Sequence, residues 1–291
     1  MDWASKHLEQ LARSPICGYY VDSAPSTEAT AWNALALAGA GRTGPVTKAA
    51  QWLAELQQDS GSVGISQEQT TPRWPTSLAV LVWLADGSQR WQRQINAATD
   101  WTLNSFARTY DFQDKLVGHD TTIPAWSWVD DTHCWVEPTS LHIVALTAAG
   151  HADHQRTRDG IRMLLNRQMI GGGCNYGNTS VLGQPLVAHV MPSGYSLVAL
   201  SIAAKDDERV LRSLEYLKHQ VSRRPTSVSL SMASIAISAF GVEVERRDEL
   251  LETALNRSIK TRDSMYRRAL AVLASQSERN KLIGLMRKGV S

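Results

Sequence analysis

Two kinds of helical segment alternate along the chain. The first kind is rich in Ala, Leu and Val and carries few charges, so its helices would be covered on most sides. The second kind is more charged and places apolar residues at helical spacing, as Val210, Leu214 and Leu217 do, which predicts helices with one buried face. The apolar segments are 26–41, 73–87, 135–150, 191–205, 229–241 and 264–275, and the amphipathic segments are 46–57, 92–107, 155–169, 206–220, 247–258 and 276–288.

The apolar segments form a loose internal repeat. They align on Ala31, Ser77, Ser140, Ser196, Ser234 and Arg268, at intervals of 34 to 63 residues. Repeats of this size indicate stacked supersecondary units that share one continuous core. The pattern therefore predicts an all-α fold of about six helical hairpins, with the apolar helices inside and the amphipathic helices facing water.

Composition narrows the class of protein. With 291 residues and 43% hydrophobic residues, the chain can bury a sizeable core, and a net charge of +2 argues against nucleic acid as a main partner. The three cysteines lie too far apart in sequence for a disulfide framework. The N-terminus lacks the apolar stretch of a secretory signal, and no run approaches the ~18 apolar residues of a membrane span. We expect a cytoplasmic protein.

The strongest local signal lies between Ala125 and Pro138, at the junction of a long loop and an apolar helix. Three indoles, three carboxylates, a histidine and a thiol fall within this stretch. Indole faces stabilise cations, and a carboxyl desolvated among them gains a raised pKa and becomes a proton donor. The alternative is a helix start with solvated aspartates and with tryptophans packed for area. All ten tryptophans of the chain lie between Trp3 and Trp135.

A zinc site is a further alternative. Asp131, His133 and Cys134 are permitted ligand types, with His189 or Cys174 as distal partners. Their spacing matches no H-E-x-x-H or C-x-x-C pattern, so we expect neither a metal nor another cofactor.

The stretch from Trp135 through Leu146 resembles the prenyltransferase and squalene oxidase repeat of terpenoid cyclases and protein prenyltransferase β-subunits. The stretch from Trp52 to Gly64 is similar to that family's Q-x-x-D-G-S-W turn, with Val63 where the family has an aromatic residue. The segment 166–173 looks like a second copy. This resemblance covers roughly residues 27–273.

The resemblance implies a fold and a chemistry. The fold is an α/α toroid of six inner and six outer helices around an apolar cavity suited to isoprenoids. Class II terpene cyclases start cyclisation with a D-x-D-D motif, and Asp130 falls on its proton-donor position, while Trp128 replaces the first acid. Protein prenyltransferases also need a separate subunit, and this chain is long enough for one toroid only.

We therefore expect residues 1–25 to form an N-terminal helix and lead-in, and residues 26–291 to form the toroid. Two functions stay open: a terpenoid cyclase-like or prenyltransferase-like enzyme that holds an isoprenoid, or a binding or scaffold module without catalysis. A partner subunit and peripheral membrane contact are compatible with both. The candidate catalytic residues are Asp130 and Asp131. The candidate substrate-binding residues are Glu28, Trp74, Trp126, Trp128, His133, Cys134, Trp135, Glu137, Tyr176 and Tyr195.

Overall fold

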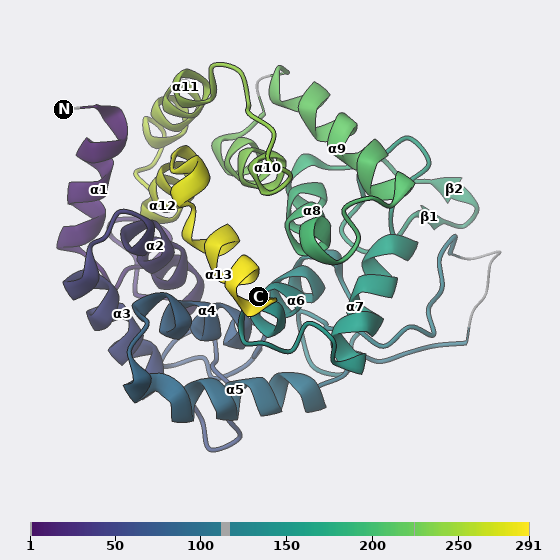
Figure 1. The fold of residues 1–291 in the computed structure, drawn as a ribbon, viewed down its shortest axis with the longest axis horizontal. Helices are drawn as coiled ribbons and strands as arrows, with labels where there is room; N and C mark the ends of the chain where they lie inside the picture. Colours follow the sequence, from purple (N-terminus) through teal and green to yellow (C-terminus); the bar gives the residue numbers. More distant parts are fainter. Residues whose placement is uncertain (1, 112–116, 224, 291) are drawn as a thin grey trace.

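The protein is described by a computed structural model that covers residues 2–111, 117–223 and 225–290 (Figure 1). These residues form α-helices, two 3₁₀ turns (Gln89–Trp91 and Ser277–Arg279) and one short hairpin of β1 (Ser180–Val181) and β2 (Gln184–Pro185). The α-helices are α1 (Trp3–Arg13), α2 (Thr27–Gly39), α3 (Thr43–Glu55), α4 (Thr76–Asp86), α5 (Gln92–Asn104), α6 (Val136–Ala148), α7 (Gln155–Asn166), α8 (Val190–Ala203), α9 (Glu208–Val221), α10 (Ser227–Ala239), α11 (Arg247–Ile259), α12 (Met265–Ser275) and α13 (Lys281–Gly289).

The predicted all-α class is confirmed, and the apolar segments become the buried helices α2, α4, α6, α8, α10 and α12. Along α2 and α6, for example, buried residues occur on every side of the helix. Helices without a polar face must be surrounded by protein, and the small residues Ala, Ser and Gly allow close approach between them. At Gly194 an added Cβ would lie 2.7 Å from Met232 of α10.

These six helices pack in a cyclic order. Each contacts the next one along the chain, from α2 to α4, α6, α8, α10 and α12, and α12 packs back against α2 (Figure 1). The two ends of the repeat region therefore share an interface. Their contact continues into the preceding loop, where Tyr266 N donates to Tyr19 O and Ser264 Oγ donates to the same oxygen.

The amphipathic helices α3, α5, α7, α9 and α11 pack outside this core, each against one or two of the buried helices. Their buried residues lie at the expected helical spacing, as Val210, Leu214 and Leu217 do in α9. Helix α1 also packs outside, against α12 and α2, and it carries the same one-sided burial pattern. The N-terminal helix is thus an outer helix of the same body.

The last amphipathic helix, α13, corrects the sequence prediction. We expected the segment 276–288 to be one of the outer helices that face water, but α13 packs across α6, α2 and α4 instead. Its tip is so close to the C-terminal end of α6 that a Cβ at Gly289 would lie 1.9 Å from Thr147 O. The amphipathic pattern correctly indicates one buried face, made by Leu282, Ile283, Leu285 and Met286, but does not identify what covers it.

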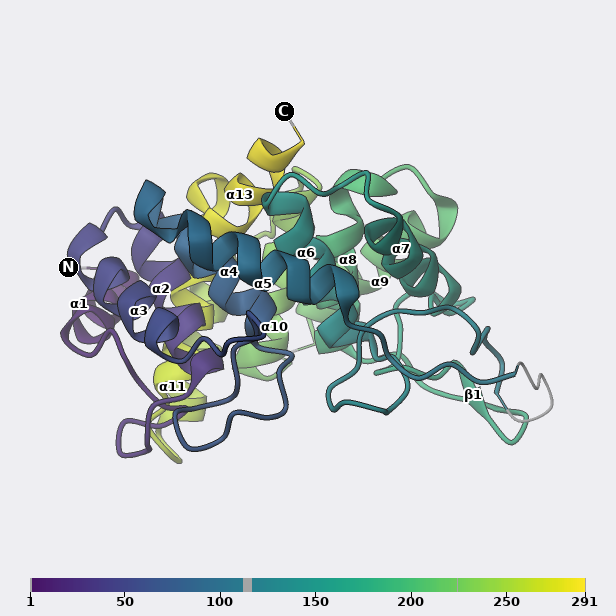
Figure 2. The ribbon, with the colours of Figure 1, turned by 90° about the horizontal axis from the view of Figure 1, so that it is seen from below.

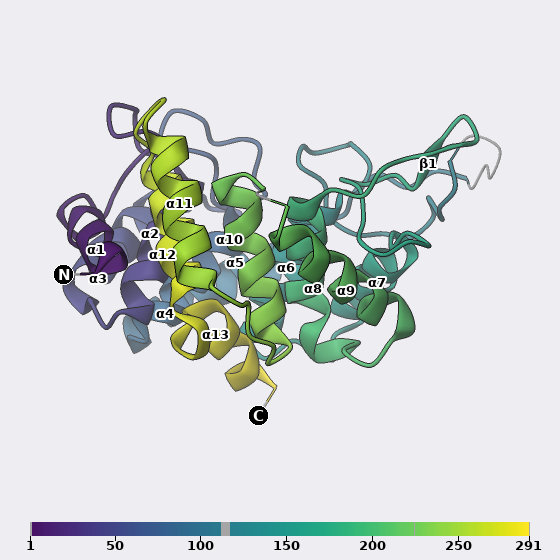
Figure 3. The same cartoon turned by 90° about the horizontal axis from the view of Figure 1, so that it is seen from above.

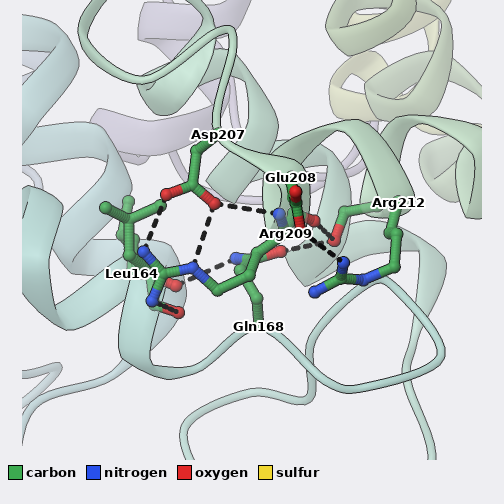
Figure 4. A network of polar contacts seen from close by, with 8 residues as sticks. Leu164, Gln168, Asp207, Glu208, Arg209 and Arg212 are labelled. Carbon is green, nitrogen blue, oxygen red and sulfur yellow. Dashed lines mark hydrogen bonds and ion pairs between the residues drawn. The ribbon is translucent and has the colours of Figure 1, made fainter.

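The two glycine-rich turns that resemble each other in sequence also have the same geometry. Gly61 follows α3 with φ of +88°, and a Cβ there would lie 2.2 Å from Ala97 O of α5. Gly172 follows α7 with φ of +85°, and its Cβ would lie 2.5 Å from Arg212 O of α9. Beside the second turn, the Gln168 amide donates to Leu164 O and accepts from the Ser213 hydroxyl (Figure 4). Each turn thus packs the end of one outer helix against the next outer helix.

The two ends of the helical body differ. Helix α13 covers the C-terminal ends of the buried helices, and the long loops that precede α4, α6 and α8 lie on the opposite side (Figures 2 and 3). The side chains in the first turns of the buried helices are therefore near the loop-bearing end. Over the residues described here, none of the helices is both long and apolar enough to cross a bilayer.

Candidate functional site

Two buried glutamates lie in the first turns of α2 and α6. Glu28 is 8% exposed and Glu137 is 5% exposed. Both stand three residues before the aligned positions Ala31 and Ser140, so they occupy the same place in the repeat. Charged side chains are rarely buried this deeply unless other polar groups surround them. These two carboxyls are therefore the natural starting point for a site.

Aromatic side chains with polar atoms surround the carboxyls. The Tyr19 hydroxyl donates to Glu28 Oε2, and Tyr266 and Trp32 lie beside the same carboxyl. Tyr195 lies beside Glu137. We call these six residues the central cluster: Tyr19, Glu28, Trp32, Glu137, Tyr195 and Tyr266.

The central cluster spans the middle of the helical body. The rings of Trp32 in α2 and Tyr195 in α8 have centroids 6.2 Å apart, although α2 and α8 are not neighbours in the cyclic order. The Tyr266 ring in α12 is 5.3 Å from Tyr19. Side chains from opposite helices thus meet at the centre, and they are polar as well as aromatic. The resemblance implied an apolar lining, so the polar centre is a difference from that expectation.

Burial raises the pKa of both carboxyls. For Glu137, desolvation and the nearby Glu28 charge raise the pKa to about 8, against a smaller opposing effect of Tyr195. Burial also raises the pKa of Glu28, but the hydrogen bond from the Tyr19 hydroxyl and the nearby polar groups of Tyr266 and Trp32 oppose this effect. Two carboxyls that interact in this way share protons as a pair. We expect Glu137 to keep its proton at neutral pH, because its pKa is raised to about 8.

Two polar atoms of the central cluster have no hydrogen-bond partner of good geometry among the described residues. They are Trp32 Nε1 and the Tyr195 hydroxyl, and both belong to side chains that are at most 2% exposed. A buried donor without a partner costs about 1–3 kcal/mol. Such atoms are expected where a ligand or an ordered water completes the structure.

This arrangement can perform two chemical tasks. A protonated carboxyl beside an ionised one can donate a proton and have it returned, which is general acid–base chemistry. An ionised carboxylate among indole and phenol rings can also stabilise positive charge, since aromatic faces attract cations. Because Glu137 has a raised pKa, it is a weak acid, better suited to protonating oxygen than an unactivated double bond.

The predicted acids lie elsewhere. Asp130 and Asp131 are exposed in the loop before α6, and Asp131 has φ of 61°. Asp130 Oδ2 is 3.4 Å from Arg73 Nη2, and 55% of the Asp130 side chain is exposed. Asp130 is thus not buried as the proton-donor role requires, so that role stays a prediction that the geometry does not favour.

Three of the four predicted tryptophans, Trp74, Trp126 and Trp128, form a second aromatic group between α4, α5 and α6. Trp74 packs edge-to-face on Trp128, with centroids 4.5 Å apart. Trp126 stacks on His142 at 5.2 Å, and its Nε1 donates to Thr102 O. The Arg156 guanidinium lies 4.2 Å from the Trp126 ring and donates to three backbone carbonyls of the neighbouring loop. This group fixes the loop before α6 in place.

The remaining predicted residues lie on the other side of that loop. The His133 and Trp135 rings are 4.5 Å apart, and the buried Cys134 thiol accepts from Arg167 at 3.7 Å. Tyr176 is 39% exposed, with its ring 5.2 Å from His189. Of the ten predicted binding residues, the structure brings Glu28, Glu137 and Tyr195 together in the central cluster. Within the described residues, no three His, Cys, Asp or Glu side chains are grouped as a metal site.

Sequence reasoning missed Tyr19, Trp32 and Tyr266. Trp32 directly follows the aligned position Ala31, and Tyr195 directly precedes the aligned position Ser196, so both were within reach of the repeat alignment. A signal was therefore present: polar aromatic residues next to the repeat register of otherwise apolar helices. Tyr19 gave no such signal, because it lies in the loop between α1 and α2, outside the repeat.

Comparisons with known proteins define the fold alone. No family profile matches the chain, and no curated protein matches it. The chain is similar to a solved structure of a protein from Actinoplanes, with a TM-score of 0.58 and 13% identity over 99% of this chain and 100% of that one. At this identity the likeness concerns the arrangement of helices over the whole chain.

Proposed function

We propose that this chain is an α/α toroid whose central cluster handles an oxygen-bearing isoprenoid or a similar apolar molecule by general acid catalysis. The support for the toroid is the cyclic order of contacts among α2, α4, α6, α8, α10 and α12, with amphipathic helices outside them. The support for the chemistry is that burial raises the pKa of both Glu28 and Glu137, and that the Glu28 charge raises the pKa of Glu137 further.

In this proposal Glu137 donates a proton to the oxygen of an epoxide or an allylic alcohol. The C–O bond then breaks, so that the epoxide oxygen stays on the substrate as a hydroxyl group and the alcohol oxygen leaves as water. The carbocation finally loses a proton to the Glu137 carboxylate. The positive charge that develops is stabilised by the Glu28 carboxylate and by the faces of Trp32, Tyr195 and Tyr266. The Tyr19 hydroxyl holds the Glu28 carboxylate in place. The substrate enters from the loop-bearing end, since α13 covers the other end.

The experiment is an assay of the purified protein with squalene, squalene epoxide, and farnesyl and geranylgeranyl alcohols and diphosphates. Mass spectrometry measures product formation. We expect turnover of an oxygenated substrate, a loss of at least about a hundredfold in Glu137→Gln, as for removal of a general acid, and little change in Asp130→Asn. Turnover that survives Glu137→Gln would contradict the assignment of the acid.

The second candidate is a binding or scaffold module without catalysis. One observation favours it: Trp32 and Tyr195 meet across the centre and are at most 2% exposed, so side chains occupy space that an open cyclase cavity would leave free. Saturable binding of the same compounds without any product would support this candidate.

The proposal also includes the cellular location of the protein and its partners. A cytoplasmic location agrees with three cysteines that are all free. A partner subunit or a membrane surface would meet the chain at the loop-bearing end, because the first turns that carry Glu28 and Glu137 lie there.

A further inference from the structure

A cavity of about 330 Å³ lies outside the central cluster, beside the loop that precedes α6. The described residues of its walls come from two parts of the chain: the loop residues 108–111, 117–121 and 133–134, and the segment that follows α7. This cavity is lined by guanidinium and imidazole groups, whereas the central cluster contains two carboxyls. The residues that decide it are Arg108, Tyr110, His119, His133 and Arg167.

Arg167 is a buried cation that forms no ion pair with a carboxylate of the described residues. It caps the C-terminal end of α7 and is 2% exposed. Its guanidinium donates to Gly177 O at 2.8 Å, to Asn166 Oδ1 and to Cys134 Sγ, which are all neutral groups. Among the ion pairs of the described residues, none involves Arg167; Asp120 is near enough to affect its pKa only weakly. A buried charge without a counter-ion is costly, so the surroundings of Arg167 favour an anionic ligand.

Two imidazole nitrogens in the same walls also lack partners. His119 is 5% exposed and its Nδ1 has no hydrogen-bond partner among the described residues, and the buried Nε2 of His133 has none. Burial, followed by the charges of Arg167 and His133, lowers the pKa of His119 to about 4. A neutral imidazole retains one N–H, which it can donate to an oxygen atom.

We propose that this cavity is a binding site for a small organic oxyanion, with Arg167 as its buried counter-ion and His119 and His133 as hydrogen-bond donors. The oxyanion is a carboxylate or a phosphate, since a guanidinium and imidazole N–H groups recognise both. The volume exceeds what a free phosphate needs, and Tyr110 and Val117 supply apolar wall for an organic body. Arg108, which is exposed and lies over the Tyr110 ring, adds positive charge at the rim, and Asp111 is the one acid among the described residues of the walls.

The test follows the His119 and His133 side chains by NMR while inorganic phosphate, glycerol 3-phosphate or succinate is added at constant ionic strength. We expect saturable shifts of both imidazoles with at least one organic probe. The tighter of glycerol 3-phosphate and succinate identifies the anionic group. Saturation by inorganic phosphate as tightly as by the organic probes would contradict the organic body, and the absence of saturable shifts with all three would overturn the site.

Variants separate this site from general charge effects. Arg108→Gln and His119→Gln should each weaken binding at least tenfold, and Arg167→Met should abolish it. Arg93→Gln removes an exposed charge of α5 and should leave binding unchanged. Should Arg167→Met fail to fold, Arg108→Gln and His119→Gln decide the matter, because neither residue donates a side-chain hydrogen bond to the described backbone. Equal weakening by Arg93→Gln would also overturn the proposal.

Discussion

Single residues set the geometry of the turns between outer helices. Gly61 and Gly172 have positive φ and face the backbone of the following outer helix at distances that no side chain tolerates. Other residues rarely adopt this conformation without strain. The glycines in these turns therefore matter for two separate reasons, backbone conformation and close packing.

The two reasons can be separated by substitution. Gly61→Ala should lower the free energy of unfolding by more than about 1 kcal/mol, because φ of +88° and a carbonyl at 2.2 Å both oppose a Cβ. Gly41→Ala is the matched control, since Gly41 has φ of +72° but open space around it. Urea unfolding measures both. A loss in Gly61→Ala no larger than that in Gly41→Ala would show that the packing contact is unimportant.

The protonation of Glu137 predicts an unusual pH dependence of stability. Its pKa rises from 4.5 to about 8 on folding, so the folded protein binds more protons than the unfolded chain between these values. Stability from this group is complete below about pH 4.5 and is lost as the pH rises through about 8. Each pKa unit corresponds to about 1.4 kcal/mol.

Glu137→Gln keeps the shape of the side chain but cannot ionise. Its melting temperature should therefore fall less than that of the wild type between about pH 5 and about pH 9. Glu55→Gln changes an exposed carboxyl of α3 and is the control. Identical pH profiles for the wild type and Glu137→Gln would show that Glu137 is ionised in the folded protein.

The individual site residues also show how much of the site could be predicted from the sequence. Glu28, Glu137 and Tyr195 were selected from the sequence, and the repeat register explains why the two glutamates meet. Asp130 was selected because it matches a motif position, yet motif position does not determine burial: its loop exposes it beside Arg73. Burial depends on contacts between distant segments, which a local motif does not contain.

At the scale of helices, position along the chain was predictable and packing partners were only partly so. The alternation of apolar and amphipathic segments correctly located helices α2 to α13, because periodicity reports which faces are buried. It did not reveal that α13 covers the ends of the buried helices or that α1 is an outer helix. An amphipathic face is compatible with any apolar partner, so the partner must come from the fold.

The position of α13 leads to a stability prediction. Leu282 is 1% exposed on the face of α13 that is turned to the buried helices, so Leu282→Ala should cost about 2–5 kcal/mol. Arg287→Ala, on the exposed face of the same helix, is the control and should cost little. Chemical denaturation followed by circular dichroism measures both. A loss below about 1 kcal/mol for Leu282→Ala would mean that α13 is loosely attached.

For the whole molecule, the interface between α2 and α12 predicts cooperative unfolding. All ten tryptophans lie in the first 135 residues, so tryptophan fluorescence reports the N-terminal half, whereas circular dichroism reports helices throughout. In a closed set of contacts neither half can unfold without disrupting the other, so the two urea transitions should coincide. An open stack of repeats would allow separate transitions, with different midpoints for the two probes.

The central claim is that a carboxyl in the middle of the helical body keeps its proton at neutral pH. Infrared spectroscopy in neutral D₂O tests this claim directly, because a protonated carboxyl has a carbonyl band distinct from that of a carboxylate. We predict that the wild type and Asp130→Asn show this band and that Glu137→Gln lacks it. A wild-type spectrum without the band, or a band that persists in Glu137→Gln, would contradict the account.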